Sequence, residues 1–258
     1  MMKYLFTLLV STLVFGEIQT AELTYTSDGV NMKGYLAFDD AISDPVPGVL
    51  VVHEWWGHNE YARMRARKLA ELGYVALAVD MYGEGKQASH PEDAMKFVQE
   101  VTANYDGALE RFRVAMELLR SHPRTDPTKI AAIGYCFGGA TVLNCARAGF
   151  DLKAVVSFHG SLGTPRPAEK GKVKAEVLVC HGADDPFVTP EDIEGFKKEM
   201  TDAGVTYTFT AYEGAKHSFT NPGANEFGTK FNLPLEYNQK ADEASWADMK
   251  ALFTRVFK

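Results

Sequence analysis

The sequence predicts an α/β fold, with one mostly parallel central sheet and helices on both of its faces. Strand-like apolar runs alternate with helix-like segments from Glu22 to the end of the chain, as in successive β-α-β units. Residues 49–52 and 75–79 are continuously apolar, which is typical of strands that are buried on both faces. The chain has 258 residues, of which 46% are hydrophobic, enough for one large domain with a core.

Short segments rich in β-branched and aromatic residues predict the strands. In chain order they are Leu23–Thr26, Gly34–Phe38, Gly48–His53, Val75–Asp80, Lys129–Gly134, Ala154–His159, Glu176–His181 and Thr206–Tyr212.

The predicted helices fall between these strands and after the last one. They are Glu60–Leu72, Pro91–Arg120, Gly138–Ala148, Pro190–Ala203 and Asn238–Phe257. Gly73 is a stop signal for the first helix, and Thr189 is an N-cap for the fourth. Asn104-Tyr105-Asp106 can divide the second helix in two. The segment Asn221–Pro234 is rich in Gly, Asn and Pro, and is predicted to be a long surface loop.

Residues 1–21 are predicted to be a signal peptide, and residues 22–258 a single domain. A short basic start precedes residues 4–15, which are apolar apart from three hydroxyl residues. This stretch is too short to span a bilayer and matches a signal-peptide core. Cleavage after Gly16 and cleavage after Ala21 are both compatible with the sequence. Export to a bacterial periplasm is expected, the alternative being an N-terminal core strand or helix.

The net charge of −7 disfavours nucleic acids and anionic membrane surfaces as partners. We expect a monomer without stable membrane association once the signal is removed. The three cysteines, Cys136, Cys145 and Cys180, match no zinc-binding spacing. Cys145 and Cys180 are most simply small buried hydrophobic residues, and a disulfide between them is the alternative.

The segment Gly134-Tyr135-Cys136-Phe137-Gly138-Gly139 predicts a strand, a sharp turn and a helix. Glycines flank the turn because a Cβ atom there would clash with the strand or the following helix. This is the nucleophile elbow of an α/β-hydrolase, with cysteine in the position that serine usually holds. A thiol ionises more readily than a hydroxyl, so Cys136 is the predicted nucleophile.

A cysteine nucleophile needs a general base, and the base needs an acid that orients it. In α/β-hydrolases the nucleophile, acid and histidine follow in this order along the chain. His217 lies in the loop after the last predicted strand. Asp184 and Asp185 both follow the strand that ends at His181, and they compete for the role of the acid. All these groups are expected at the carboxyl edge of the sheet.

The segment 53–58, His-Glu-Trp-Trp-Gly-His, follows the strand that begins at Gly48. In α/β-hydrolases a loop at this place supplies one N–H group of the oxyanion hole, and the residue after the nucleophile supplies the other. His53, Glu54 and His58 are types of residue that bind metals. However, two histidines five residues apart do not share one helix face, and no metal site is predicted.

Five segments in the correct order make the chain resemble the dienelactone hydrolase family, from residue 34 to residue 257. They are His53–Gly57, Asp80–Gly83, Gly134–Gly139, Gly182–Val188 and Lys216–Phe219. The resemblance implies Cys136 as nucleophile, Asp185 rather than Asp184 as the acid, and His217 as the base. It also implies an α/β-hydrolase fold and a hydrolase that needs no cofactor or metal.

The resemblance also implies roles for residues around the nucleophile. In the family, a glutamate at the position of Glu54 hydrogen-bonds the resting thiol and helps to deprotonate it once substrate binds. The backbone N–H groups of Trp55 and Phe137 would then bind the oxyanion. Trp56 and Tyr82 would form walls of the substrate pocket.

The chain departs from the family where two arginines bind the substrate carboxylate. The matching segment Asp80–Lys86 contains no arginine, and the position four residues after His217 is Asn221. This anion clamp is missing, or is replaced by a residue such as Lys86, which is not equivalent to a bidentate arginine. Lys86 and Asn221 are therefore candidate substrate-binding residues.

The expected function is hydrolysis of a small ester or lactone, related to that of carboxymethylenebutenolidase but with a different specificity. The reaction would use a Cys-His-Asp triad and an acyl-thioester intermediate. Two alternatives are a non-catalytic exported ligand-binding protein on the same fold and a thiol-redox protein that uses Cys136. The complete triad disfavours the first, and the absence of a Cys-x-x-Cys pair disfavours the second.

Overall fold

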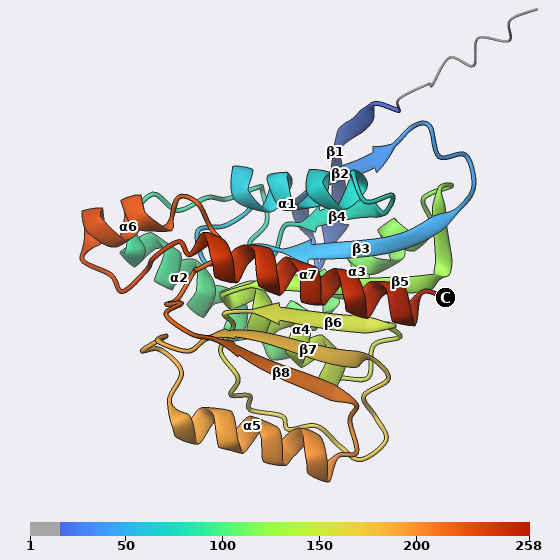
Figure 1. Ribbon diagram of the computed structural model, residues 1–258. Helices are drawn as coiled ribbons and strands as arrows, with labels where there is room; N and C mark the ends of the chain where they lie inside the picture. Colours follow the sequence, from blue (N-terminus) through green and yellow to red (C-terminus); the bar gives the residue numbers. More distant parts are fainter. Residues whose placement is uncertain (1–15) are drawn as a thin grey trace, which may run out of the picture.

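One eight-stranded sheet runs through the computed structural model, which describes residues 16–258 (Figure 1). Its strand order is β1-β2-β4-β3-β5-β6-β7-β8. The strands are β1 (Ile18–Ser27), β2 (Val30–Asp39), β3 (Val46–Val52), β4 (Val75–Val79), β5 (Thr125–Tyr135), β6 (Ala154–Phe158), β7 (Glu176–Gly182) and β8 (Tyr207–Tyr212). Strand β1 pairs with β2, and β2 with β4, in antiparallel fashion, while β3 to β8 are parallel. The predicted mostly parallel sheet is confirmed.

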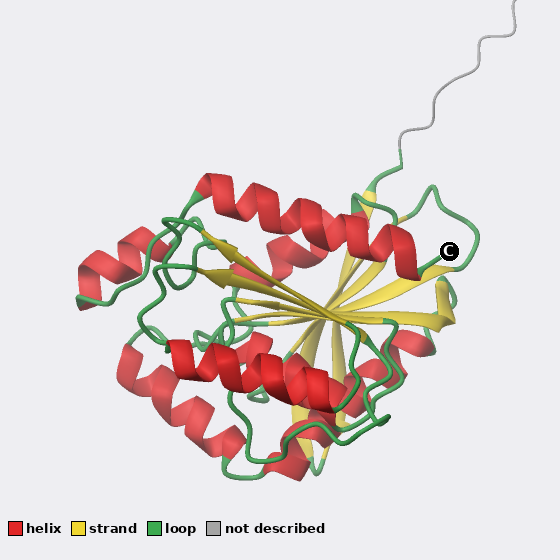
Figure 2. Ribbon diagram, turned by 60° about the horizontal axis from the view of Figure 1, so that its bottom comes forward, coloured by secondary structure: helices red, strands yellow, loops and turns green. Residues whose placement is uncertain are grey.

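Helices cover both faces of this sheet (Figure 2). They are α1 (Glu60–Ala70), α2 (Pro91–Thr102), α3 (Tyr105–Arg120), α4 (Phe137–Arg147), α5 (Pro190–Asp202), α6 (Ala224–Phe231) and α7 (Gln239–Val256). Helices α1 and α7 pack on one face, and α3, α4 and α5 pack on the other. The two faces therefore have separate hydrophobic cores.

The central strands are continuously apolar because both of their faces are buried. In β3, Leu50 and Val52 contribute to the core under α3 and α4, whereas Val49 and Val51 contribute to the core under α1 and α7. Successive strand residues point to opposite faces, so burial on both sides requires an uninterrupted apolar run.

The predicted helix boundaries rest on local hydrogen bonds. Asn104 divides the long second helix into α2 and α3, since its side chain accepts from the Gly107 N–H at 2.9 Å. Thr189 caps α5 in a reciprocal capping box with Asp192. Gly73 follows α1 with a φ of +87°, a left-handed conformation that favours glycine.

Two boundaries differ from the sequence prediction. The segment predicted as a long loop contains helix α6, so that prediction was wrong for residues 224–231. Strand β1 begins at Ile18, inside the predicted signal segment, and residues 18–21 pair with residues 36–39 of β2. The apolar core of the predicted signal peptide, residues 4–15, lies outside the described residues.

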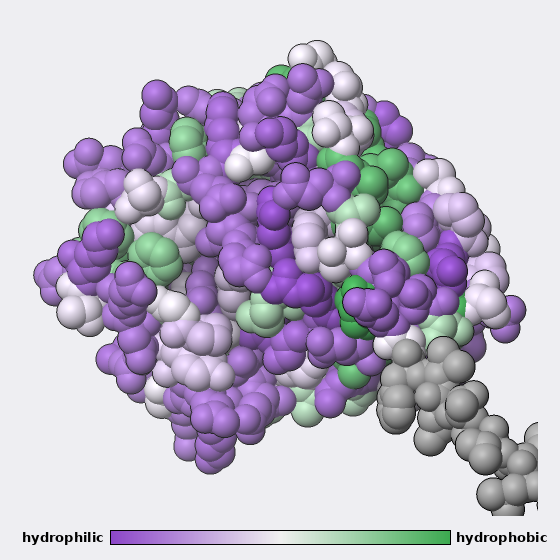
Figure 3. All heavy atoms as spheres, turned by 90° about the horizontal axis from the view of Figure 1, so that it is seen from above, coloured by the Kyte–Doolittle hydropathy of each residue, from purple (hydrophilic) through white to green (hydrophobic). Residues whose placement is uncertain are grey.

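The surface near β1, β2 and α1 is mostly hydrophilic, with a limited hydrophobic area (Figure 3). No helix within residues 16–258 combines the length and the apolar character needed to cross a membrane.

The carboxyl ends of the parallel strands bring four functional candidates to one edge of the sheet. Glu54 follows β3, Cys136 follows β5, Asp185 follows β7 and His217 follows β8. Ligands of open α/β sheets bind at this edge, which is where the sequence predicted the site.

Candidate active site

Cys136 occupies the sharp turn between β5 and α4. Its φ is +53°, a conformation that non-glycine residues rarely adopt outside strained turns. A Cβ atom on Gly134 would lie 2.0 Å from the carbonyl oxygen of Gly138, and one on Gly138 would lie 2.3 Å from the carbonyl oxygen of Val52. The two glycines thus allow the turn that leaves Cys136 partly accessible.

His217 and Asp185 form a buried pair beside this turn. His217 Nδ1 lies 2.7 Å from Asp185 Oδ2, and the other carboxylate oxygen of Asp185 accepts from the Phe187 N–H at 2.9 Å. Asp185 is buried, whereas its neighbour Asp184 is exposed. The structure therefore assigns the contact with His217 to Asp185.

The charge of His217 depends on Cys136. Burial alone would lower the pKa of His217, but the charge of a Cys136 thiolate and hydrogen bonds to Asp185 and Cys136 raise it to about 10. Whenever Cys136 is a thiolate, His217 beside it is therefore held as the protonated imidazolium.

Glu54 is buried, and both of its carboxylate oxygens accept hydrogen bonds. Ser218 Oγ donates to Oε1 at 2.8 Å, and Asn221 Nδ2 donates to Oε2 at 2.6 Å. Burial raises the pKa of Glu54, and the two hydrogen bonds partly oppose that rise. The hydrogen bonds from Ser218 and Asn221 to Glu54 were not predicted from the sequence. The only hint was that Ser218 directly follows His217.

A second buried network fixes the segment that carries His217, Ser218 and Asn221. Arg65 donates to the carbonyl oxygen of Thr220 at 2.5 Å and to Asp242 at 2.6 Å. The Thr220 hydroxyl lies 2.6 Å from the Tyr61 hydroxyl and 2.7 Å from Nε2 of His159. Helices α1 and α7 thereby hold the loop after β8 in position.

The predicted oxyanion donors follow two neighbouring strands of the sheet, β3 and β5. Phe137 is the first residue of α4, where a backbone N–H has no partner within the helix. Trp55 follows β3, and its carbonyl oxygen accepts from the Tyr82 hydroxyl at 2.9 Å. Tyr82 also packs on Phe137, with ring centroids 5.5 Å apart, so it supports both residues.

Comparison with known proteins identifies the family. Residues 32–257 match the model of the dienelactone hydrolase family. The chain belongs to this family. It is accordingly a hydrolase of the ester and lactone type, as the sequence motifs predicted.

Two solved structures and one relative identified by sequence are similar to most of this family member. A dienelactone hydrolase-like promiscuous phosphotriesterase from metagenomic libraries is 36% identical with a TM-score of 0.88, covering 94% of this chain and 100% of that chain. A structure named m3DLH is 37% identical with a TM-score of 0.89 and the same coverage. Protein usf of Aquifex pyrophilus is 29% identical over 202 residues, which are 76% of this chain and 85% of that protein.

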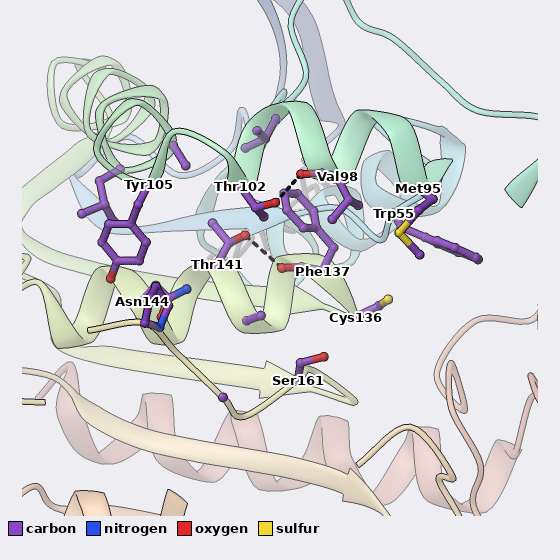
Figure 4. Close-up of a pocket in the computed structure, with 16 residues that line it drawn as sticks. Trp55, Met95, Val98, Thr102, Tyr105, Cys136, Phe137, Thr141, Asn144 and Ser161 are labelled. Atoms are coloured by element: carbon purple, nitrogen blue, oxygen red, sulfur yellow. Dashed lines mark hydrogen bonds between the residues drawn. The ribbon is translucent and has the colours of Figure 1, made fainter. Parts of the chain in front are cut away.

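A cavity of about 370 Å³ opens at Cys136 of this dienelactone hydrolase family protein (Figure 4). Cys136, Trp55 and Phe137 all line it, together with residues from α2, α3 and α4. Cys136 and the two residues predicted to supply the oxyanion donors therefore line one space that a substrate can enter.

The four predicted substrate-binding residues are not among those that line this cavity. Trp56 is buried against Phe227 of α6, with ring centroids 4.3 Å apart. Lys86 is exposed, Asn221 binds Glu54, and Tyr82 supports Trp55. Sequence order alone could not show on which side of the turn each side chain would lie.

The two other cysteines form no disulfide, and His53 makes hydrogen bonds to the backbone. Cys145 and Cys180 are buried and unpaired, and burial raises the pKa of both thiols. Within residues 16–258, no three His, Cys, Asp or Glu side chains are gathered as metal ligands. Nδ1 of His53 instead lies 2.6 Å from the Glu54 carbonyl oxygen, and its Nε2 accepts from the Met81 N–H at 3.2 Å.

Proposed function

We propose that this protein hydrolyses an ester or lactone through a Cys136-His217-Asp185 triad and an acyl-thioester intermediate. The observation that carries the proposal is the buried 2.7 Å contact between His217 and Asp185 beside the strained turn at Cys136. The three residues together would supply a nucleophile, a base and an orienting acid, which is the arrangement that acyl transfer requires.

In the acylation step, the Cys136 thiolate forms a bond to the carbonyl carbon of the substrate. The N–H groups of Trp55 and Phe137 stabilise the negative charge that develops on the carbonyl oxygen. The C–O bond to the alcohol then breaks, and protonated His217 gives its proton to the departing alkoxide. In a lactone, that alcohol stays attached to the acyl group.

In the deacylation step, His217 removes a proton from a water molecule that attacks the thioester carbonyl. Asp185 keeps the imidazole in the orientation and tautomer that this step needs. The C–S bond breaks, and the Cys136 thiolate is released together with the carboxylic acid. The reaction consumes only water, so no cofactor is required.

We assign to Glu54 the role of a proton acceptor for the resting Cys136 thiol when substrate enters. Its raised pKa, caused mainly by burial, suits a carboxyl group that exchanges a proton with a thiol. Ser218 and Asn221 hold both oxygens of Glu54, so this role requires one of these hydrogen bonds to be exchanged for a contact with Cys136.

Dienelactone itself is not the substrate that we propose. Neither Lys86 nor Asn221 lines the cavity at Cys136, so neither can replace the arginine pair that binds a carboxylate in the dienelactone enzymes. We also propose that the protein is exported, since its first residues have the pattern of a signal peptide.

The experiment is a turnover assay on a panel of small aryl esters and lactones. Hydrolysis is expected for the natural sequence, and Cys136→Ala should lower kcat by about 10³-fold or more. Cys145→Ala is the matched control, because Cys145 is buried in α4 and does not line the cavity.

The two alternatives, a ligand-binding protein and a thiol-redox protein, predict different results. If no ester or lactone is hydrolysed faster than by Cys136→Ala, the enzyme proposal fails and a ligand-binding protein is favoured. Disulfide exchange without ester cleavage would favour thiol-redox chemistry, although no second cysteine lines the cavity at Cys136.

A further inference from the structure

The cavity that opens at Cys136 extends away from the triad between two layers of helices. Helix α2 contributes Met95, Val98, Val101 and Thr102 to one wall, at intervals that put them on one helix face. Helix α4 contributes the opposite wall, from Phe137 through Ala140 and Thr141 to Asn144. Figure 4 shows Cys136 and Trp55 toward one end of this cavity and Tyr105 and Asn144 toward the other.

The walls of this cavity are uncharged. None of the sixteen residues that line it is Lys, Arg, His, Asp or Glu. Two of its hydroxyl groups are already engaged in their own helices: Thr141 donates to the Phe137 carbonyl at 2.9 Å, and Thr102 donates to the Val98 carbonyl at 2.9 Å (Figure 4). The cavity therefore presents mainly hydrocarbon surface to a ligand.

The length of the cavity follows from the helices that form it. Phe137 and Asn144 are seven residues apart in α4, which corresponds to about 10 Å at 1.5 Å per residue, roughly an extended chain of eight carbon atoms. At the nucleophile end, Met95 is 47% exposed, so an apolar side chain faces solvent where a substrate would enter.

We propose that this cavity binds an uncharged, apolar aliphatic or aryl group of the ester or lactone while its carbonyl lies at Cys136. The inference rests on the proposed function and names the substrate class of that site. An apolar group gains free energy by leaving water for such walls. A carboxylate would lose its hydration without meeting a cation, which disfavours acidic substrates such as dienelactone.

The first test measures kcat/KM for two homologous series of esters. The release of acid is used to follow the hydrolysis. One series consists of methyl esters of linear acids with two to ten carbon atoms, and the other of acetates of linear alcohols. In at least one series, kcat/KM should rise at least tenfold as the chain lengthens and then level off near eight carbons. Equal rates for all chain lengths in both series would overturn the proposal.

The second test uses Ala108→Phe, which adds bulk to the cavity wall contributed by α3. In the responsive series, the ratio of kcat/KM for the eight-carbon substrate to that for the two-carbon substrate should fall at least tenfold. Ala103→Phe is the matched control, because Ala103 is exposed and does not line the cavity. An unchanged ratio in a folded Ala108→Phe protein would contradict the proposal.

The third test isolates charge at nearly constant size. Methyl hexanoate and monomethyl adipate differ mainly by a terminal carboxylate, and the charged ester should have at least a tenfold lower kcat/KM at pH 7.5. Equal or faster turnover of the adipate would overturn the proposed substrate class. If neither ester series reacts at all, the hydrolase mechanism itself fails, so the two failures are distinguishable.

Discussion

At the scale of single residues, the site holds two carboxylates in different surroundings, and we propose different tasks for them. Asp185 is hydrogen-bonded to His217 and to a backbone N–H, an arrangement that suits an acid that orients the imidazole. Glu54 is fully buried and its pKa is raised by that burial, an arrangement that suits proton exchange. Their positions after β7 and β3 would not by themselves have distinguished these surroundings, whereas burial and hydrogen bonds do.

The neighbouring aspartates offer a matched pair for the first prediction. Asp185→Asn should lower kcat by about 10²–10⁴-fold, because an amide no longer stabilises the imidazolium of His217 or fixes its tautomer. Asp184→Asn, an exposed position one residue earlier, should change kcat less than twofold. Steady-state kinetics on one small ester measure both; equal effects of the two substitutions would contradict the assignment.

The raised pKa of Glu54 predicts a dependence of stability on pH. Above its ordinary pKa of 4.5, the unfolded chain releases the proton while the folded protein still tends to keep it, so ionisation of Glu54 destabilises the folded state as pH rises. Glu54→Gln cannot ionise. The free energy of unfolding of this variant, relative to the natural sequence, should therefore increase from pH 4.5 to pH 7.

Urea unfolding at the two pH values measures this difference. Ser218→Ala is a useful comparison, because it removes one hydrogen bond that opposes the rise in the pKa of Glu54. It should make the stability fall more steeply with pH. The account would be contradicted if Glu54→Gln and the natural sequence differed in free energy of unfolding by the same amount at both pH values.

At the scale of elements, the elbow between β5 and α4 depends on close backbone packing. Gly134→Ala should lower the free energy of unfolding by about 3 kcal/mol or more, because the new Cβ would meet the Gly138 carbonyl oxygen at 2.0 Å. Gly195→Ala is the control in α5, where an added Cβ meets nothing within 4 Å.

The control should raise the free energy of unfolding by about 0.5–1 kcal/mol, because alanine is the better helix former. Chemical denaturation of both variants tests whether the two substitutions change the free energy of unfolding in opposite directions. A stable, fully active Gly134→Ala protein would show that the elbow does not require the close approach described here.

The strands were predictable because burial on both faces leaves a continuous apolar run such as 49–52. The position of Cys136, Asp185 and His217 at one edge of the sheet was predictable because each residue follows the carboxyl end of a parallel strand. Helix α6 was not, since its flanks are rich in Gly and Asn and its aromatic residues pack on distant Trp56. The cavity walls were not predictable either, because they combine α2, α3 and α4, which only tertiary packing brings together.

At the scale of the whole molecule, the N-terminal strand limits where the chain can be cleaved. Residues 18–21 pair with 36–39, so cleavage after Ala21 would remove part of β1, whereas cleavage after Gly16 would leave the strand intact. If the proposed export occurs through a cleaved signal peptide, we therefore predict that the mature protein begins at Glu17. Mass spectrometry of the mature protein from the periplasm of an expressing bacterium measures this; a mature chain that begins at Glu22 would contradict it.

The central claim is that Cys136 carries the acyl group during turnover. The most direct measurement is mass spectrometry of the protein quenched in acid while it hydrolyses a slow ester, followed by peptide mapping. The account predicts that the mass of one acyl group is added to the peptide containing Cys136, and that Cys136→Ala shows no such addition. Sustained turnover with no acyl group on Cys136, or with the group on another residue, would contradict it.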